Sequence, residues 1–282
     1  MKNIKLNLKL LMTVLAISLF ITGCSDNDEP VNNDEQQQDY SEVSKSAEID
    51  KASDSMDDIS IEIYEEQERS EENRTTSDFS MMPDCVTVTV VIQQNYREIT
   101  IDFGSEGCLI HGNILKGKII LTYTRDPEVQ EVYITKTLEN FYFNNKNLQG
   151  GKTILKELSN ENGNPQFTKT SDLTVIWPNG AQASRGGEKV REWIEGHGSG
   201  IWSDNVFEIT GHWSTTFING NTHTYEVMTP LRREVICFYF VSGDVDVQRT
   251  NFGGTFDYGE GNCDNMATFT FNNGEVVDIV LN

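Results

Sequence analysis

The sequence predicts an all-β protein, an antiparallel meander forming a sandwich, a half-barrel or a barrel, preceded by an acidic segment with one α-helix. Between residues 85 and 282, short runs alternate apolar and polar residues, as in Val86-Thr87-Val88-Thr89-Val90. β-Branched and aromatic residues fill these runs, which suits half-buried strands, of which we count about thirteen. Asn-Gly pairs, which favour tight hairpins, separate several of them: Asn162-Gly163, Asn179-Gly180, Asn219-Gly220 and Asn273-Gly274. No long helical pattern lies between the runs, so a parallel βαβ sheet is not expected.

Residues 1–23 read as a lipoprotein signal peptide. Three lysines precede an apolar stretch over residues 10–21 that is too short for a membrane-spanning helix. The stretch ends in Ile21-Thr22-Gly23-Cys24, which resembles the lipobox of bacterial lipoproteins. The resemblance implies that Cys24 becomes the first residue of the mature chain and carries acyl groups such as palmitate, which hold it on a membrane. The alternative is an ordinary secretory peptide that is cleaved elsewhere.

An acidic run, Ser25-Asp26-Asn27-Asp28-Glu29, follows this cysteine directly. It resembles the signal that sends lipoproteins of the Bacteroidetes type to the outer leaflet of the outer membrane. The resemblance implies an outer-membrane protein exposed on the cell surface. The alternative is that the run merely begins an acidic linker and the protein faces the periplasm.

Residues 24–84 are interpreted as a lipidated acidic tether. Residues 25–84 contain 20 Asp and Glu against 4 Lys and Arg, and so supply most of the net charge of −22. Like charges at this density repel and keep a chain extended and unburied, and we expect the run 32–39 to lack structure. A nucleic-acid-binding protein needs clustered Lys and Arg to displace counterions, so nucleic acid is not an expected partner.

One stretch of the tether has helical periodicity. Ile49, Ala52, Met56, Ile59 and Ile63 recur at spacings of three and four residues, with acidic residues on the other faces. This pattern predicts a helix over about residues 41–68. Its narrow apolar stripe either docks on the protein's own β domain, which we favour, or pairs with a partner helix in a coiled coil.

The β domain, residues 85–282, contains two related units near 85–123 and 237–281. Asp102-Phe103-Gly104 aligns with Asp257-Tyr258-Gly259, and a cysteine follows six residues after each aspartate. A cysteine also opens the strand expected before each motif, Cys85 before Val86 and Cys237 before Phe238-Tyr239-Phe240. Such repetition indicates a duplicated strand-loop-strand unit.

The cysteines other than Cys24 are even in number, which in an exported protein predicts disulfides. The repeat favours the pairs Cys85–Cys108 and Cys237–Cys263. The pairs Cys85–Cys263 and Cys108–Cys237 are the alternative. Because no Cys-x-x-Cys or clustered histidine motif is present, we expect neither a metal site nor another cofactor.

Candidate catalytic residues are few. We expect His212 and His223 to face each other across the Asn219-Gly220 hairpin as a surface pair rather than a metal site. Asp102 and Asp257 could supply the paired carboxylates of a hydrolase. An aspartate before an aromatic-glycine pair more often accepts hydrogen bonds from turn amides, and we prefer that interpretation.

The four tryptophans, at positions 177, 193, 202 and 213, fall within 37 residues. Trp177 and Trp202 lie beside predicted turns, where exposed rings can stack on sugars. These two are candidate ligand-binding residues, although packing in the core is the more frequent role of tryptophan on a strand.

The β domain also resembles a group of uncharacterised outer-membrane lipoproteins of the Bacteroidetes type, over most of residues 85–282. The motifs that carry the resemblance are Thr100-Ile101-Asp102-Phe103-Gly104 with Cys108, residues 117–123, residues 207–211 and residues 257–268. The resemblance implies an exported β lipoprotein and carries over no activity.

The sequence therefore predicts a non-enzymatic, lipid-anchored envelope or cell-surface protein whose β domain binds or scaffolds a partner. Its membrane contact would be the lipid on Cys24, and its other partner a glycan or an envelope protein. A surface glycan-binding module that uses Trp177 and Trp202, and a carboxylate-dependent hydrolase, are the alternatives.

Overall fold

The computed structural model describes residues 33–126 and 128–281, with side chains from residue 41 onward. Residues Gln38–Asn282 form one compact unit. The helix α1 (Asn33–Asn73) enters this unit at Gln38, and fourteen strands follow it. In the described part of the chain, no helix is both long and apolar enough to cross a membrane.

The strands follow one another with short connections. They are β1 (Thr87–Gln93), β2 (Tyr96–Asp102), β3 (Cys108–Ile110), β4 (Asn113–Thr124), β5 (Glu131–Phe143), β6 (Lys146–Glu157), β7 (Gln166–Ile176), β8 (Gln182–Glu195), β9 (Val206–Phe217), β10 (Thr222–Glu234), β11 (Ser242–Arg249), β12 (Phe252–Glu260), β13 (Met266–Phe271) and β14 (Val276–Val280), with a 3₁₀ turn η1 (Trp202–Asp204) before β9.

All fourteen strands belong to one antiparallel sheet. Apart from β3, which pairs with β4 beside the main path, the strands are ordered as they occur in the sequence, from β1 to β14. Strands β1 and β14 are the two edges, and among the described residues no ladder joins them. The predicted all-β antiparallel meander with one preceding helix is confirmed, and the sheet is open rather than a closed barrel.

The four predicted Asn-Gly hairpins are present. Their glycines, at positions 163, 180, 220 and 274, have φ between +83° and +89°, a region that other residues rarely adopt. In three of the turns the asparagine side chain accepts a hydrogen bond from the backbone amide two residues on, as Asn219 does from Asn221 at 3.0 Å. The turns therefore follow from local side-chain chemistry.

The predicted disulfides are confirmed. Cys85 pairs with Cys108 and Cys237 with Cys263, each with Cα atoms 5.6 Å apart. In each unit one disulfide closes a loop that contains a two-strand hairpin, β1–β2 or β11–β12. The alternative connectivity is excluded.

One strand prediction in the second unit is wrong. Residues 238–240 lie in a bend between strands, and β11 begins only at Ser242. The Arg233 guanidinium explains this, because it donates hydrogen bonds to the carbonyls of Cys237 and Tyr239, which therefore serve a side chain instead of a strand ladder.

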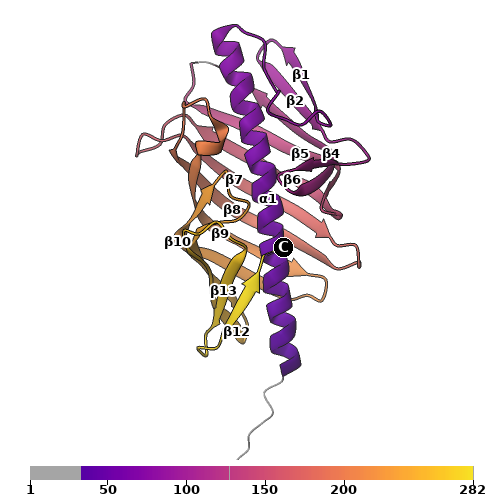
Figure 1. The fold of residues 1–282 in the computed structure, drawn as a ribbon, viewed down its shortest axis with the longest axis vertical. Helices are drawn as coiled ribbons and strands as arrows, with labels where there is room; N and C mark the ends of the chain where they lie inside the picture. The colour runs from indigo at the N-terminus through magenta and orange to yellow at the C-terminus, as the bar shows by residue number, and fades with distance from the viewer. Residues whose placement is uncertain (1–32, 127, 282) are drawn as a thin grey trace, which may run out of the picture. The chain divides into compact units, whose positions relative to one another are not determined.

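Helix α1 lies across the sheet and is part of the core (Figure 1). It begins eight residues before the predicted start, so it takes in most of the run expected to lack structure. The predicted stripe of Ile49, Met56 and Ile63 is buried among apolar side chains of β2 to β7. Val43 and Ala47 pack with the aromatic cluster of the carboxyl-terminal strands. The helix thus docks on its own β domain, as the favoured interpretation expected.

Candidate functional site

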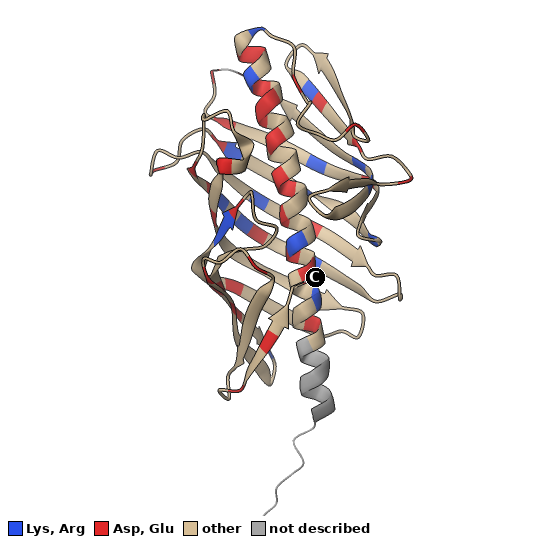
Figure 2. Cartoon of the chain, in the orientation of Figure 1, with Lys and Arg blue, Asp and Glu red and all other residues tan. Residues whose placement is uncertain are grey.

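The contact between α1 and the sheet is built from opposite charges. Figure 2 shows acidic residues along the helix and basic residues on the strands behind it. At least eleven of the fifteen lysines and arginines in residues 85–282 form ion pairs with helix carboxylates. These eleven are Arg97, Arg125, Lys136, Lys146, Lys152, Lys156, Lys169, Arg185, Lys189, Arg191 and Arg233.

Asp57 is at the centre of this interface, with its side chain only 1% exposed. Three lysines from three adjacent strands converge on its carboxylate: Lys136 of β5, Lys152 of β6 and Lys169 of β7. Lys152 lies 2.8 Å and Lys169 2.7 Å from Oδ2. Lys152 also donates a hydrogen bond to the Ser53 hydroxyl at 2.7 Å.

Burial and charge act against each other in this cluster. Burial alone would raise the pKa of the Asp57 carboxyl, but the three lysines hold that pKa well below its ordinary value. Burial lowers the pKa of Lys136 to about 7 and that of Lys169 to about 8, although Asp57 favours their charged forms. The carboxylate is therefore fixed as an anion, and removing it would leave lysines without their counterion.

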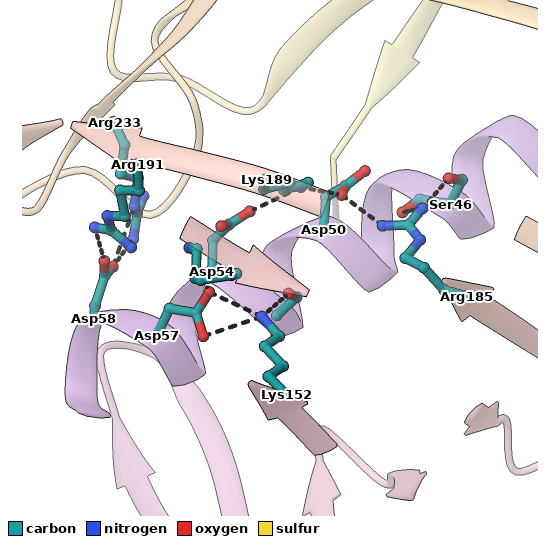
Figure 3. Close-up of polar contacts among 12 residues, drawn as sticks. Ser46, Asp50, Asp54, Asp57, Asp58, Lys152, Arg185, Lys189, Arg191 and Arg233 are labelled. Atoms are coloured by element: carbon teal, nitrogen blue, oxygen red, sulfur yellow. Dashed lines mark hydrogen bonds and ion pairs between the residues drawn. The ribbon is translucent and has the colours of Figure 1, made fainter. Parts of the chain in front are cut away.

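Arginine pairs flank the lysine cluster along the helix (Figure 3). Asp58 binds two guanidinium groups, Arg191 of β8 and Arg233 of β10, the latter at 2.6 Å. About two helical turns before Asp57, the Asp50 carboxylate accepts hydrogen bonds from Arg185 at 2.5 Å and from Lys189 at 2.8 Å. These contacts fix the rotation of the helix about its axis as well as its position.

Charged contacts continue to both ends of the described helix. Near the amino-terminal end, Glu42 lies 2.7 Å from Nε2 of the buried His223. Near the carboxyl-terminal end, Glu71 receives two hydrogen bonds from Arg97, both at 2.7 Å. A bidentate pair of this kind adds geometric specificity to the attraction.

The expectation that the acidic segment stays unburied is wrong. The expectation rested on repulsion among the acidic residues, but lysines and arginines of strands far along the chain neutralise that repulsion. A signal for them exists in the strands themselves. Lys136 follows Val132 and Ile134 at alternate positions, and Lys169 follows Phe167, so each lysine falls on the same strand face as buried apolar residues.

A cleft opens beside the carboxyl-terminal half of α1. A cavity of 140 Å³ is lined by Glu62, Trp193, Trp202 and the glycine-rich loop 196–200. A larger space of 440 Å³ adjoins it and shares Arg69, Trp193 and Gly198. Gly196 is required in the loop 196–200, because a Cβ atom would lie 2.5 Å from Oδ1 of Asn205.

The two candidate tryptophans lie at different places. Trp177 follows β7, is only 8% exposed and donates a hydrogen bond to Glu48 at 2.9 Å. Trp202 is half-buried and lines the cleft with Glu62. Glu48 and Glu62 are separated by roughly 20 Å along the helix, at 1.5 Å per residue. Trp177 and Trp202 therefore do not belong to one binding site. The tryptophan that lies beside Trp202 is Trp193, which the sequence did not single out as a candidate.

The carboxylates considered for catalysis hold turns. Asp102 accepts the Gly104 amide at 2.8 Å, and Asp257 accepts the Gly259 amide at 2.7 Å. Eight strands lie between β2 and β12 in the sheet order. In the described residues no group of three or more His, Cys, Asp or Glu side chains is arranged to hold a metal ion.

The histidine prediction is wrong, because the ladder register places other residues opposite them. His212 lies opposite Glu226, and His223 lies opposite Thr215. His223 is buried against the helix rather than paired on the surface.

Fold and site together define an open antiparallel meander wrapped on an acidic helix, with an aromatic cleft beside that helix. No family model, no curated protein and no solved structure matches the chain. Cys24, the predicted lipidation site, and the signal peptide 1–23 lie outside the described residues.

Proposed function

We propose that this protein is a non-enzymatic, lipid-anchored protein of the bacterial outer membrane whose β unit binds a ligand or an envelope partner. The observation that carries the proposal is the position of α1. Residues 42–71 of the segment that follows Cys24 are held in the β unit by contacts of their carboxylates, from Glu42 with His223 to Glu71 with Arg97. A lipid anchor at Cys24 would therefore act on a rigid folded unit.

The connection between anchor and fold is short. Eight residues, 25–32, separate Cys24 from the start of α1 at Asn33. At about 3.5 Å per residue they span at most roughly 30 Å. Most of the segment 24–84 is therefore helix rather than spacer.

The cleft supports binding over hydrolysis. Two tryptophans and an unpaired carboxylate line it, a combination typical of small-molecule recognition. Asp102 and Asp257, by contrast, are engaged with backbone amides at opposite parts of the strand order. A neutral glycan is one ligand class that such an aromatic cleft accommodates.

Anchoring is tested by metabolic labelling with an alkynyl palmitate in cells that express the full chain. We expect label on the wild type and none on Cys24→Ala, with a matched Cys85→Ala variant still labelled. Label that persists in Cys24→Ala contradicts the proposed anchor. Protease added to intact cells then distinguishes the two faces of the membrane, because digestion indicates surface exposure and protection indicates the periplasmic face.

Binding is tested by thermal shift of the full chain in detergent against polysaccharides, glycopeptides and lipids. A ligand that binds only the native state raises the melting temperature with concentration. If the same compounds are instead turned over, and Asp102→Asn or Asp257→Asn abolishes the turnover without unfolding the protein, the hydrolase alternative replaces the proposal.

A further inference from the structure

The cavity beside Glu62 has two aromatic walls that meet nearly at a right angle. The ring centroids of Trp193 and Trp202 are 5.7 Å apart, and their planes are inclined by 83°. Both rings line the cavity, as does Glu62 of α1. Two perpendicular indole rings and a carboxylate therefore line one cavity, which we call the cage.

Hydrogen bonds with one buried asparagine, Asn205, hold this cage in place. Trp193 donates from Nε1 to Oδ1 of Asn205 at 3.0 Å, and Asn205 donates from Nδ2 to the carbonyl of Trp202 at 2.8 Å. The Trp193 ring also packs against Phe207, with centroids 5.1 Å apart. Contacts within the protein thus position the walls, which reduces the entropy that binding has to overcome.

Glu62 differs from the other buried acids of the helix. It is only 8% exposed, and no described residue forms a hydrogen bond or ion pair with it. The other carboxylate that lines the cavity, Glu66, already accepts from Ser70 at 2.9 Å and from the Asp78 amide at 3.0 Å, and it pairs with Arg69. Asp58, one turn before Glu62, repels its negative charge.

We propose that this cavity binds an organic ammonium group, with Glu62 as its counterion and the rings of Trp193 and Trp202 as its aromatic lining. The inference rests on the proposed function, since it names the ligand class of the same cleft. A buried carboxylate without a partner is costly, and a cation supplies the missing partner. Indole faces attract cations, most strongly where water is excluded.

The size of the cavity agrees with one ammonium group. Its 140 Å³ is close to the roughly 150 Å³ of a cavity that holds a benzene-sized molecule. The adjoining space of 440 Å³ leaves room for the rest of the ligand. An amino sugar, an aliphatic amine and a quaternary ammonium compound share this chemistry, and the experiment separates them.

The test uses the full chain in detergent and follows tryptophan fluorescence and calorimetric binding at about pH 8, above the pKa of Glu62, which burial raises to about 7. The probes are glucosamine, cadaverine and choline, with glucose and N-acetylglucosamine as neutral controls. We expect at least one ammonium probe to bind and to change the fluorescence, and the probe that does so identifies the source. Raised salt should weaken the binding, because the attraction is ionic in part.

Variants assign the binding to the cage. Glu62→Gln and Trp202→Ala should each weaken the binding about tenfold or more. Glu161→Gln, the same change in the exposed β6–β7 turn, should leave it unchanged. Circular dichroism and melting curves show whether each variant is folded. If Trp202→Ala unfolds, Glu62→Gln alone decides the test, because glutamine has the shape of the neutral acid and should keep the fold.

Failure of the inference is distinct from failure of the proposed function. If the neutral sugars bind and the ammonium probes do not, or if Glu62→Gln binds an ammonium probe as well as the wild type, the ammonium site is wrong and a ligand-binding function remains. If the folded wild type binds none of the ammonium probes, the inference is likewise overturned. Persistent palmitate label on Cys24→Ala contradicts the anchored-protein proposal instead, whatever the cavity binds.

Discussion

Asp57 of α1 accepts two hydrogen bonds from Lys152 of β6, at 2.8 and 3.0 Å, although 95 residues separate them in the sequence. Both side chains are at most 2% exposed. The contact ties the amino-terminal helix to the middle of the sheet. It makes the acidic segment an integral part of the fold, with consequences for stability and for the design of fragments.

Loss of the Asp57 carboxylate should destabilise the protein strongly. Asp57→Asn leaves Lys136, Lys152 and Lys169 facing a neutral group, and breaking a buried ion pair in this way costs about 3–5 kcal/mol. Urea unfolding measures the difference. Adding Lys136→Met to Asp57→Asn should restore part of the loss, because one uncompensated cation is then removed.

The matched control for Asp57 is Glu195, whose side chain is 57% exposed and pairs with Arg232 on the surface. Glu195→Gln should change the free energy of unfolding by less than about 1 kcal/mol. Equal effects of the two substitutions would show that the buried cluster does not stabilise the fold.

The β domain should not fold without its helix. A fragment of residues 77–282 lacks α1, so at least eleven cations lose their carboxylate partners and the apolar face that covers Ile49, Met56 and Ile63 becomes exposed. We expect no cooperative melting transition for this fragment alone. A peptide of residues 38–73 added in trans should restore a cooperative transition, and a scrambled peptide of the same composition should not. A cooperative melt of the lone fragment at the wild-type temperature would contradict the prediction.

Glu62 should make stability fall as the pH rises. Burial, with repulsion from Asp58, raises the pKa of Glu62 from 4.5 to about 7. The native state therefore prefers the protonated acid, and stability present below pH 4.5 is lost as the pH rises through 7. The full shift corresponds to about 3 kcal/mol.

The comparison between wild type and Glu62→Gln isolates this effect, because Asp58, Glu66, Arg69 and Asp204 are unchanged in both. Urea unfolding between about pH 4.5 and pH 8 should show the variant gaining stability relative to the wild type as the pH rises. A constant difference across this range would mean that Glu62 is already ionised at low pH and has a partner.

Local features of this fold could be predicted from the sequence. The Asn219-Gly220 hairpin and the turn held by Asp102 depend on a few adjacent residues, so their chemistry is visible in the sequence. The disulfides followed from the repeat, which places equivalent cysteines around equivalent hairpins. The apolar stripe of α1 likewise indicated a docked helix.

The partners of the helix could not be predicted in the same way. Asp50 meets Arg185 across 135 residues and Asp57 meets Lys136 across 79, so no local pattern links them. The cage residue Glu62 is a further case. In the sequence it is equivalent to the nearby Glu65 and Glu66, and only the folded arrangement supplies Glu65 with Lys156 and leaves Glu62 without a cation.

The disulfide pairing leads to a prediction about additivity. Each bond closes a loop of about 25 residues and should contribute about 3.5 kcal/mol by constraining the unfolded chain. The double variant Cys85→Ser with Cys108→Ser removes one bond, whereas Cys85→Ser with Cys237→Ser removes both. The second variant should therefore lose about twice as much stability as the first in urea unfolding, because each bond closes its own loop. If the chain instead paired Cys85 with Cys263, the first variant would break both bonds, and so would the second, and their losses would be equal.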